Sequence, residues 1–253
     1  MSTRITRRRL ITTAVTAAAG VSGVGVAASI ANRYGLIPPD HQGLYGVGET
    51  LTYAAQRVLT SGYSLAREFD RSQISPVPPV NGEAPEKASY QRQLAGGFSE
   101  WRLPIDGLVA RPASLSLADL RALPTRSQIT LQACEEGWSF IAEWTGAQLS
   151  SVLELVGPAP HARYVFFFCY DDWFESIDMA DALHPQTLIA YGMNGQDLPP
   201  NHGAPARLKL PRQLGYKNLK YLSRITVTDS VADVGEGLGG GAPEAGYSWY
   251  AGI

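Results

Sequence analysis

The sequence is poor in cysteine and carries no excess of basic charge. Its 253 residues include 2 Cys, and its formal net charge is −2. Without a basic patch or a long run of one charge, we expect no nucleic-acid partner. The 4 His are scattered and show no zinc-ligand spacing with the cysteines, and there is no Cys-x-x-Cys-His motif for covalent haem. Without a zinc or haem motif, a catalytic or binding site in this chain would have to rely on individual residues.

A strongly apolar run is missing as well. Arg7, Arg8 and Arg9 precede a stretch of Ala, Val, Gly and Thr that is too mildly apolar for a strong transmembrane helix. A basic segment before an apolar one with small residues is typical of an export signal, and the paired arginines match the twin-arginine type. We therefore predict that residues 1–30 are a twin-arginine export signal and that the protein is periplasmic or otherwise extracytoplasmic. An uncleaved membrane anchor is the alternative.

The remaining residues, 31–253, are predicted to form a single α+β domain. The chain has 26 Gly, 17 Pro and 45% hydrophobic residues, which suits a core with many turns better than a helical bundle. Apolar periodicity predicts a helix over 49–69 and, after a capping box at Thr145–Gln148, a second helix that ends near Val156. Apolar or β-branched runs predict strands at 128–133, 163–170, 188–191 and 225–228.

Cys134 follows the first of these strands directly, and a glycine turn comes soon after it. A thiol at a strand end faces a cavity more readily than a sheet interior, so it is a candidate nucleophile or soft metal ligand. Two other interpretations are open. One is a disulfide with Cys169, the default in an oxidising compartment. The other is a Cys–His acyl-transfer pair, which Glu135 and Glu136 disfavour because their charges would raise the pKa of the thiol.

A later stretch combines basic residues with glycines. His202, Arg207, Lys217 and Lys220 lie within one short span, and the glycines between them allow the backbone to approach a ligand. Basic side chains and backbone amides together suit a phosphate or a pterin. Ordinary solvated charges would explain the lysines alone, whereas Arg207 at the head of an alternating strand favours a large anionic cofactor.

Four ordered motifs match a known family. They read Cys-Glu-Glu-Gly-Trp-Ser at 134–139 with Trp-Thr-Gly at 144–146, Ala-Tyr-Gly-Met-Asn-Gly at 190–195, His-Gly-Ala-Pro-Ala-Arg at 202–207 and Gly-Tyr-Lys-Asn-Leu-Lys at 215–220. From about Asn81 to the C-terminus, the chain resembles molybdopterin-dependent oxidoreductases of the sulfite oxidase fold. Among these, it is similar to the periplasmic methionine sulfoxide reductase catalytic subunits.

The resemblance implies a fold, a cofactor and a set of site residues. The fold would be an α+β, sulfite-oxidase-type molybdopterin-binding domain of mixed β-sheets and short helices, and the cofactor would be molybdenum-molybdopterin. Cys134 would be the thiolate ligand of molybdenum, and the C-terminal tail would place Tyr250, or failing that Tyr247, near the metal. The residues implied to bind the cofactor are Asn81, Cys134, Cys169, His202, Arg207, Asn218, Leu219 and Lys220.

Departures from the family pattern bear on the substrate. Sulfite oxidases have an arginine where this chain has Val80, and basic residues where it has Glu135 and Glu136. The loss of positive charge disfavours anionic sulfite. We therefore expect two-electron oxygen-atom transfer on a small substrate of S-oxide or N-oxide type, with Trp173 near the substrate entrance. A separate electron-transfer protein, such as a membrane haem protein or a cytochrome, would be the redox partner. A sulfite dehydrogenase and a metal-free binding protein on the same fold are the alternatives.

Overall fold

The computed structural model describes residues 31, 35–42, 46–59 and 64–253, and the chain divides into two compact units, 1–61 and 62–253. The first unit contains helix α3, Gly46–Leu59. The predicted export signal lies outside the described residues. In the part of the chain that is described, no helix combines the length and apolarity needed to cross a membrane. The site described below lies in the second unit, and the predicted domain limits, 1–30 and 31–253, stay a prediction.

The helix predicted over 49–69 is shorter than expected. Helix α3 ends at Leu59, and residues 64–69 are not helical. Glu68 instead forms a β-bridge with Thr130, and the Phe69 N–H donates to the Ile129 carbonyl at 2.9 Å. Because a strand edge offers this segment its backbone partners, extended pairing replaces the predicted last helical turns.

The described helices of the second unit are short. The α-helices are α4 (Ala88–Ala95), α5 (Leu117–Ala122), α6 (Leu149–Val156), α7 (Met179–Ala182) and α8 (Gly241–Glu244), and the 3-10 helices are η1 (Arg71–Gln73), η2 (Pro200–His202) and η3 (Gly215–Lys217). Helix α6 confirms the predicted second helix, but the predicted capping box is wrong. Thr145 belongs to a strand, and Gln148 occupies the N-cap without a side-chain hydrogen bond.

The first sheet has five strands in the order β2-β1-β10-β5-β6. They are β1 (Leu103–Gly107), β2 (Ala113–Leu115), β5 (Tyr164–Cys169), β6 (Phe174–Asp178) and β10 (Leu222–Thr228). Strand β1 runs parallel to β10, and the other pairs are antiparallel. The apolar run of β5 is buried on both faces, because Phe167 joins the core while Tyr164 meets Trp249 with ring centroids 5.8 Å apart.

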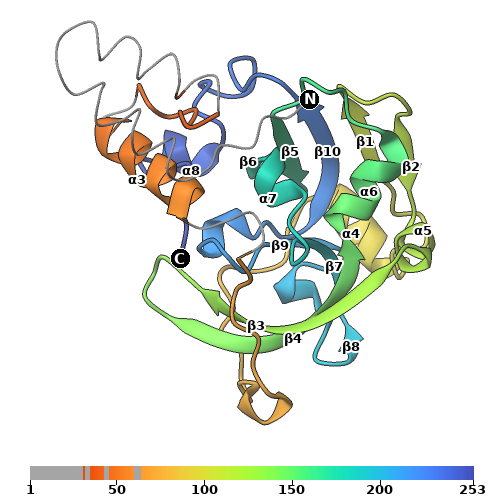
Figure 1. Cartoon of the computed structure of the whole chain (residues 1–253). Helices are drawn as coiled ribbons and strands as arrows, with labels where there is room; N and C mark the ends of the chain where they lie inside the picture. Colours follow the sequence, from red (N-terminus) through yellow and green to blue (C-terminus); the bar gives the residue numbers. More distant parts are fainter. Residues whose placement is uncertain (1–30, 32–34, 43–45, 60–63) are drawn as a thin grey trace, which may run out of the picture. The chain divides into compact units, whose positions relative to one another are not determined.

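The second sheet pairs its strands antiparallel in the order β3-β4-β7-β8, with β9 also on β7. They are β3 (Thr125–Ala133), β4 (Ser139–Gln148), β7 (Leu188–Met193), β8 (Gln196–Asp197) and β9 (Arg207–Lys209). Strands β3 and β4 form a long curved hairpin (Figure 1), and residues 134–138 are its tip. The buried side chains of β3 are polar, namely Gln128, Thr130 and Gln132.

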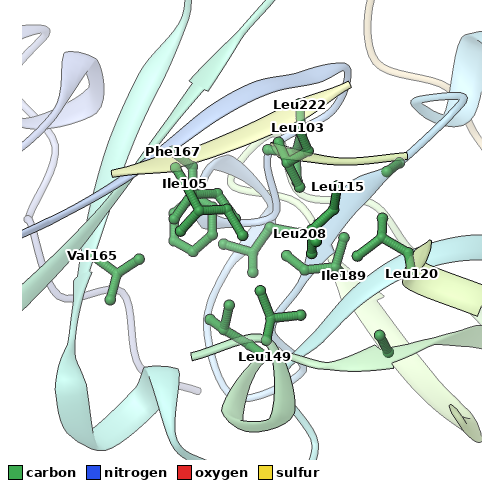
Figure 2. Close-up of a cluster of buried hydrophobic side chains, with 14 of the residues drawn as sticks. Leu103, Ile105, Leu115, Leu120, Leu149, Val165, Phe167, Ile189, Leu208 and Leu222 are labelled. Carbon is green, nitrogen blue, oxygen red and sulfur yellow. The ribbon is translucent and has the colours of Figure 1, made fainter. Parts of the chain in front are cut away.

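The main core lies between the two sheets (Figure 2). Phe167 and Leu222 of the first sheet meet Ile189 and Leu208 of the second, with Leu149 of α6 beside them. Each such buried side chain contributes about 1.5–3 kcal/mol. Since neighbouring strand residues face opposite sides, the other face of the second sheet carries a separate cluster. That cluster consists of Phe140, Ala142, Trp144, Ala190, Met193 and Leu198. The same face bears the functional residues described next.

Candidate cofactor site

A cavity of about 380 Å³ lies beside the tip of the β3–β4 hairpin. Its walls come from five stretches of the second unit, namely residues 79–83, 132–140, 169–173, 201–207 and 215–221. The volume lies within the usual range for small-molecule and cofactor sites. All eight residues that the family resemblance implied for cofactor binding are in its lining, from Asn81 to Lys220.

Cys134 stands at the hairpin tip with its side chain 7% exposed. Its N–H donates to the Trp138 carbonyl at 2.8 Å, and its carbonyl accepts from the Gly137 N–H at 3.1 Å. Gly137 has φ +92°, which a side chain would strain. The chain therefore reverses immediately after β3 and leaves the thiol at the cavity wall.

Acidic and amide groups surround the thiol. The Sγ of Cys134 lies 3.4 Å from Glu135 Oε2, 3.8 Å from Glu136 Oε2 and 3.9 Å from Asn81 Nδ2. Burial raises the pKa of Cys134, the charge of Glu135 adds to the rise, and the backbone of Glu136 partly offsets it. A free thiol is thus favoured in the absence of a cation, while a bound metal ion would deprotonate it.

Arg207 forms the buried cationic part of the cavity. Its Nη1 donates to the His202 carbonyl at 2.9 Å, and its Nη2 donates to the Asn218 carbonyl at 2.8 Å. The guanidinium lies 4.8 Å from the ring centroid of Trp144. Burial lowers the pKa of Arg207 to about 10. Its Nε is buried and has no hydrogen-bond partner among the described residues, so an anion in the cavity would relieve an uncompensated buried charge.

Lys220 and His202 stand beside Arg207. The Nζ of Lys220 donates to the Asn81 carbonyl and, at 3.2 Å, to the Asn201 carbonyl. Burial, and then the charge of Arg207, lower the pKa of Lys220 to about 8. Burial, then Arg207 and Lys220, lower the pKa of His202 to about 4. At neutral pH this wall therefore offers two cations and a neutral imidazole.

Gly203 brings these residues close together. Its φ of +108° is a conformation that side chains disfavour, and an added Cβ would lie 3.0 Å from Lys220 Cβ and 3.1 Å from Arg207 Cβ. Gly215 has a matching role opposite, since a Cβ there would lie 3.2 Å from Cys134 Cα. The glycines in the basic stretch thus allow its segments to pack against one another, as well as against a ligand.

The side chains of Asn218 and Lys217 bind other parts of the protein, whereas the sequence placed both among the ligand-binding groups. The amide of Asn218 donates to the carbonyls of Gln213 and Leu214 and accepts from the Leu210 N–H, so its side chain is fully engaged by protein. Lys217 is buried in an ion pair with Glu175 at 2.6 Å and is not a lining residue. The interpretation of Lys217 as an anion-binding cation is therefore wrong, because a buried carboxylate already neutralises it.

The two cysteines both line the cavity and are free thiols. The disulfide alternative is therefore wrong for this structure. Burial raises the pKa of Cys169 well above its usual value. Cys169 ends β5, at the point where that strand meets the cavity, and its cofactor contact stays a prediction.

Tyr250 is 8% exposed but is not a lining residue. Tyr216 lines the wall nearest the C-terminal segment, and its hydroxyl donates to the Ser248 carbonyl at 2.7 Å. Its ring centroid lies 5.4 Å from that of Tyr247. The role expected of Tyr250 at the metal stays a prediction, whereas Tyr216 and Tyr221 do line the cavity.

Sequence reasoning missed several lining residues, including Gln132, Asp171 and Tyr221. Gln132 precedes Cys134 by two positions, and strand alternation places such residues on the same face. Asp171 follows Cys169 by two positions, in the turn to β6, and burial raises its pKa. Trp173, expected near the entrance, is a lining residue that is 40% exposed.

The donor set fits the cofactor that the resemblance implies. A single thiol is the soft ligand that a transition metal accepts from protein. A guanidinium with an unused buried Nε, together with an amino group and backbone amides, suits the phosphate of a pterin cofactor. The thiol and the cationic groups line the same cavity.

Comparison with known proteins gives consistent matches. The sequence profile of the oxidoreductase molybdopterin binding domain matches residues 91–234. The putative protein-methionine-sulfoxide reductase subunit YedZ1 of Azospira oryzae is 39% identical over 189 residues, which cover 73% of this chain and 70% of that protein. The protein-methionine-sulfoxide reductase catalytic subunit MsrP of Xanthomonas campestris is 32% identical over 165 residues, 59% of this chain and 50% of that protein. The match thus spans half the length of the Xanthomonas protein.

A solved structure resembles the fold. The sulfane dehydrogenase SoxCD from Paracoccus pantotrophus matches with a TM-score of 0.50 and 24% identity, over 52% of this chain and 39% of that chain. Together with the mixed sheets and short helices, this likeness confirms the predicted sulfite-oxidase-type α+β architecture.

Proposed function

Because this chain belongs to the family of oxidoreductases with a molybdopterin-binding domain, we propose that it reduces a sulfoxide, with methionine S-oxide in peptides or proteins as the substrate. The names of the Azospira and Xanthomonas relatives, which specify protein methionine sulfoxide, support this choice. Reduction of the sulfoxide consumes two electrons and two protons and yields a thioether and water.

The observation that carries the proposal is the set of groups around Cys134. Its sulfur is within 3.4 Å of a carboxylate oxygen of Glu135, and Asp171 lines the same cavity. Val80 stands where sulfite oxidases have an arginine. A dianionic substrate such as sulfite would be repelled here, whereas a neutral sulfoxide would not.

Each lining residue has a proposed task. Cys134 is the protein ligand of the metal, and Arg207, Lys220 and the backbone at 218–220 hold the anionic end of the pterin. When bound, the cofactor supplies a metal that exchanges two electrons and one oxygen atom with substrate. Trp173 shields the entrance from water, because it is half-exposed at the rim.

The electrons are proposed to come from a separate protein, such as a membrane haem protein or a cytochrome. The relatives are named as subunits, and one of them as a catalytic subunit, which supports a divided enzyme. We further propose that the protein works in the periplasm, where oxidised methionines in exported proteins are its substrates.

The test measures metal and turnover on protein purified from a host that makes the cofactor. Wild-type protein should hold nearly stoichiometric molybdenum and reduce methionine S-oxide with a reduced viologen dye as electron donor. Cys134→Ser should lose both properties. Cys169→Ser, which removes the other thiol, should keep the metal.

Two results would contradict the proposal. Metal-loaded protein that oxidises sulfite with an artificial acceptor, and leaves sulfoxides untouched, would be a sulfite dehydrogenase. Correctly matured protein without molybdenum would point to a binding protein on the same fold.

A further inference from the structure

The buried face of β3 is a row of polar side chains that leads to Cys134. Gln128, Thr130 and Gln132 alternate along the strand, and Cys134 continues the row at the hairpin tip. Gln132 is 4% exposed and lines the cavity. A buried amide two positions before the proposed metal ligand has no assigned role in the cofactor site described above.

Lys209 holds the amide of Gln132 in one orientation. Its Nζ donates to Gln132 Oε1 at 2.7 Å and to the Leu131 carbonyl at 3.1 Å, and it lies 5.2 Å from the ring centroid of Trp144. The Nζ of Lys209 is the donor in this contact, so the oxygen of the amide faces it. The NH₂ group of Gln132 is thereby turned away from Lys209.

The turned NH₂ group has no hydrogen-bond partner within the described part of the chain. An amide donor at a cavity wall can pair with a bound acceptor, and an acceptor placed there gains a hydrogen bond. Gln128 provides the contrast on the same strand face, because its Nε2 donates to the Gln186 carbonyl at 2.8 Å. Gln128 is satisfied by protein, whereas Gln132 presents a donor to the cavity.

Lys209 is itself an expensive residue to bury. It is fully buried, and desolvation followed by the charge of Arg207 lowers its pKa well below the usual value. An anionic group in the cavity would favour its charged form. A side chain that only filled space at this position would be apolar. A buried lysine that donates to Gln132 instead indicates that the orientation of the Gln132 amide matters.

We propose that Gln132 is a further residue of the site, whose NH₂ group donates a hydrogen bond to an acceptor atom of the group bound beside Cys134, and that Lys209 is its positioning residue. The acceptor belongs either to the cofactor or to the sulfoxide oxygen of the substrate. An acceptor on the cofactor requires only that the chain belongs to this family. An acceptor on the substrate requires, in addition, that the proposed function is correct.

The decisive variant is Gln132→Glu, which keeps the side-chain shape and the oxygen that accepts from Lys209 but replaces the NH₂ donor with an acceptor. Three quantities are measured, namely molybdenum per chain, the thermal midpoint of cofactor-free protein, and KM and kcat for methionine S-oxide. If the acceptor is on the cofactor, molybdenum per chain falls about tenfold. If it is the substrate oxygen, molybdenum stays at the wild-type level and KM rises about tenfold.

In either case the thermal midpoint should not fall, because Lys209 gains an ion-pair partner. A structural role for the amide would leave metal content and KM unchanged, and that result overturns the proposal. Gln128→Glu is the matched control on the same strand face. It should lower the thermal midpoint, since it loses the bond to the Gln186 carbonyl, and keep molybdenum per folded chain.

Lys209→Met tests the positioning role and replaces Gln132→Glu if that variant does not fold. Methionine keeps the packing against Trp144 but leaves the amide of Gln132 free to rotate. Whichever quantity Gln132→Glu changes, molybdenum per chain or KM, should therefore change in the same direction in Lys209→Met, by a smaller factor. Wild-type metal content and KM in this variant would overturn the role of Lys209. Wild-type protein that binds molybdenum but does not reduce sulfoxide would refute the proposed function, and metal content would still decide the role of Gln132.

Discussion

At the scale of single residues, the anion-binding side of the cavity depends on two cations, Arg207 and Lys220, whose hydrogen bonds go to backbone carbonyls. Arg207 bonds two backbone carbonyls and leaves its Nε unused among the described residues, and Lys220 also bonds carbonyls. Lys217, close by in sequence, is instead neutralised by Glu175. Bonds to carbonyls orient a cation without cancelling its charge, so Arg207 and Lys220 can still bind an anion.

His202 gives a pH-dependent prediction. Its pKa is lowered to about 4 in the folded protein from 6.5. Between these values the unfolded chain binds more protons, so the free energy of unfolding should fall as pH decreases from 6.5 to 4. His184, whose pKa burial also lowers, acts in the same direction. Urea unfolding of cofactor-free wild type and His202→Gln at several pH values measures the effect.

The variant should show a shallower dependence on pH than wild type below pH 6.5, because one of the two buried histidines is gone. His161→Gln, at an exposed histidine, should retain the wild-type dependence. Equal slopes for wild type and His202→Gln would contradict the assignment of the effect to this residue.

The sequence identifies individual site residues better than their hydrogen-bond partners. Cys134, His202 and Arg207 stand in short motifs, and they do meet in one cavity. The contact of Gln132 with Lys209 could not be predicted, because it joins strands β3 and β9, which are far apart in the chain. Lys217 was misread for the same reason, since its partner Glu175 lies in another hairpin.

At the scale of elements, the step from η2 to β9 requires a glycine. Gly203→Ala should strain the left-handed backbone and push Lys220 and Arg207 apart. We expect a loss of about 1–3 kcal/mol in stability and reduced molybdenum content. Gly195→Ala is the matched control, since Gly195 has φ +77° but nothing within 4 Å of an added Cβ.

This control separates the strain of the left-handed backbone, which both variants have, from crowding of Lys220 and Arg207, which only Gly203→Ala has. Gly195→Ala should lose stability but keep its metal, whereas Gly203→Ala should lose both. Thermal unfolding and metal analysis of the two variants provide the comparison, and equal metal content in both would exclude a role for Gly203 in spacing the cations.

A buried ion pair joins η3 to β6. Lys217 Nζ lies 2.6 Å from Glu175 Oε2 with both side chains fully buried, and Glu175 Oε1 accepts from the Ala242 N–H at 2.6 Å. Lys217→Met should destabilise by about 3–5 kcal/mol, because it leaves a buried carboxylate unpaired. The double variant Lys217→Met with Glu175→Gln should recover part of that loss in urea unfolding.

Lys87→Met removes the exposed ion pair with Asp172 and serves as the comparison, with an expected change below about 1 kcal/mol. Strict additivity of the Lys217 and Glu175 substitutions would contradict direct coupling between them.

Elements with a strong internal pattern were predictable, and those set by distant partners were not. The apolar run of β5 and the apolar face of α6 were correct. The extension of α3 to residue 69 was wrong because Glu68 and Phe69 pair with β3. The polar buried face of β3 was hidden as well, since burial of glutamine depends on partners such as Lys209 and the Gln186 carbonyl.

At the scale of the whole molecule, the proposed export route makes a direct prediction. Arg7→Lys with Arg8→Lys should keep the protein in the cytoplasm, because the twin-arginine machinery reads the arginine pair. Cell fractionation with immunodetection measures the distribution. The mature protein should still bind molybdenum when made without residues 1–30, since the cavity is built from residues 79–221. Unimpaired export of the lysine variant would refute the route.

The pairing of β1 with β10 joins the first strand of the second unit to its last one, and Gln213 bridges to Gly252 near the C-terminus. The chain is synthesised from its N-terminus, so β1 cannot pair with β10 until residues 222–228 have been made and have left the ribosome. The cavity lining extends to Tyr221, directly before β10, so the site is complete only once these residues have been made, and cofactor loading follows that point. If the chain crosses the membrane already folded, loading of the cofactor comes before translocation.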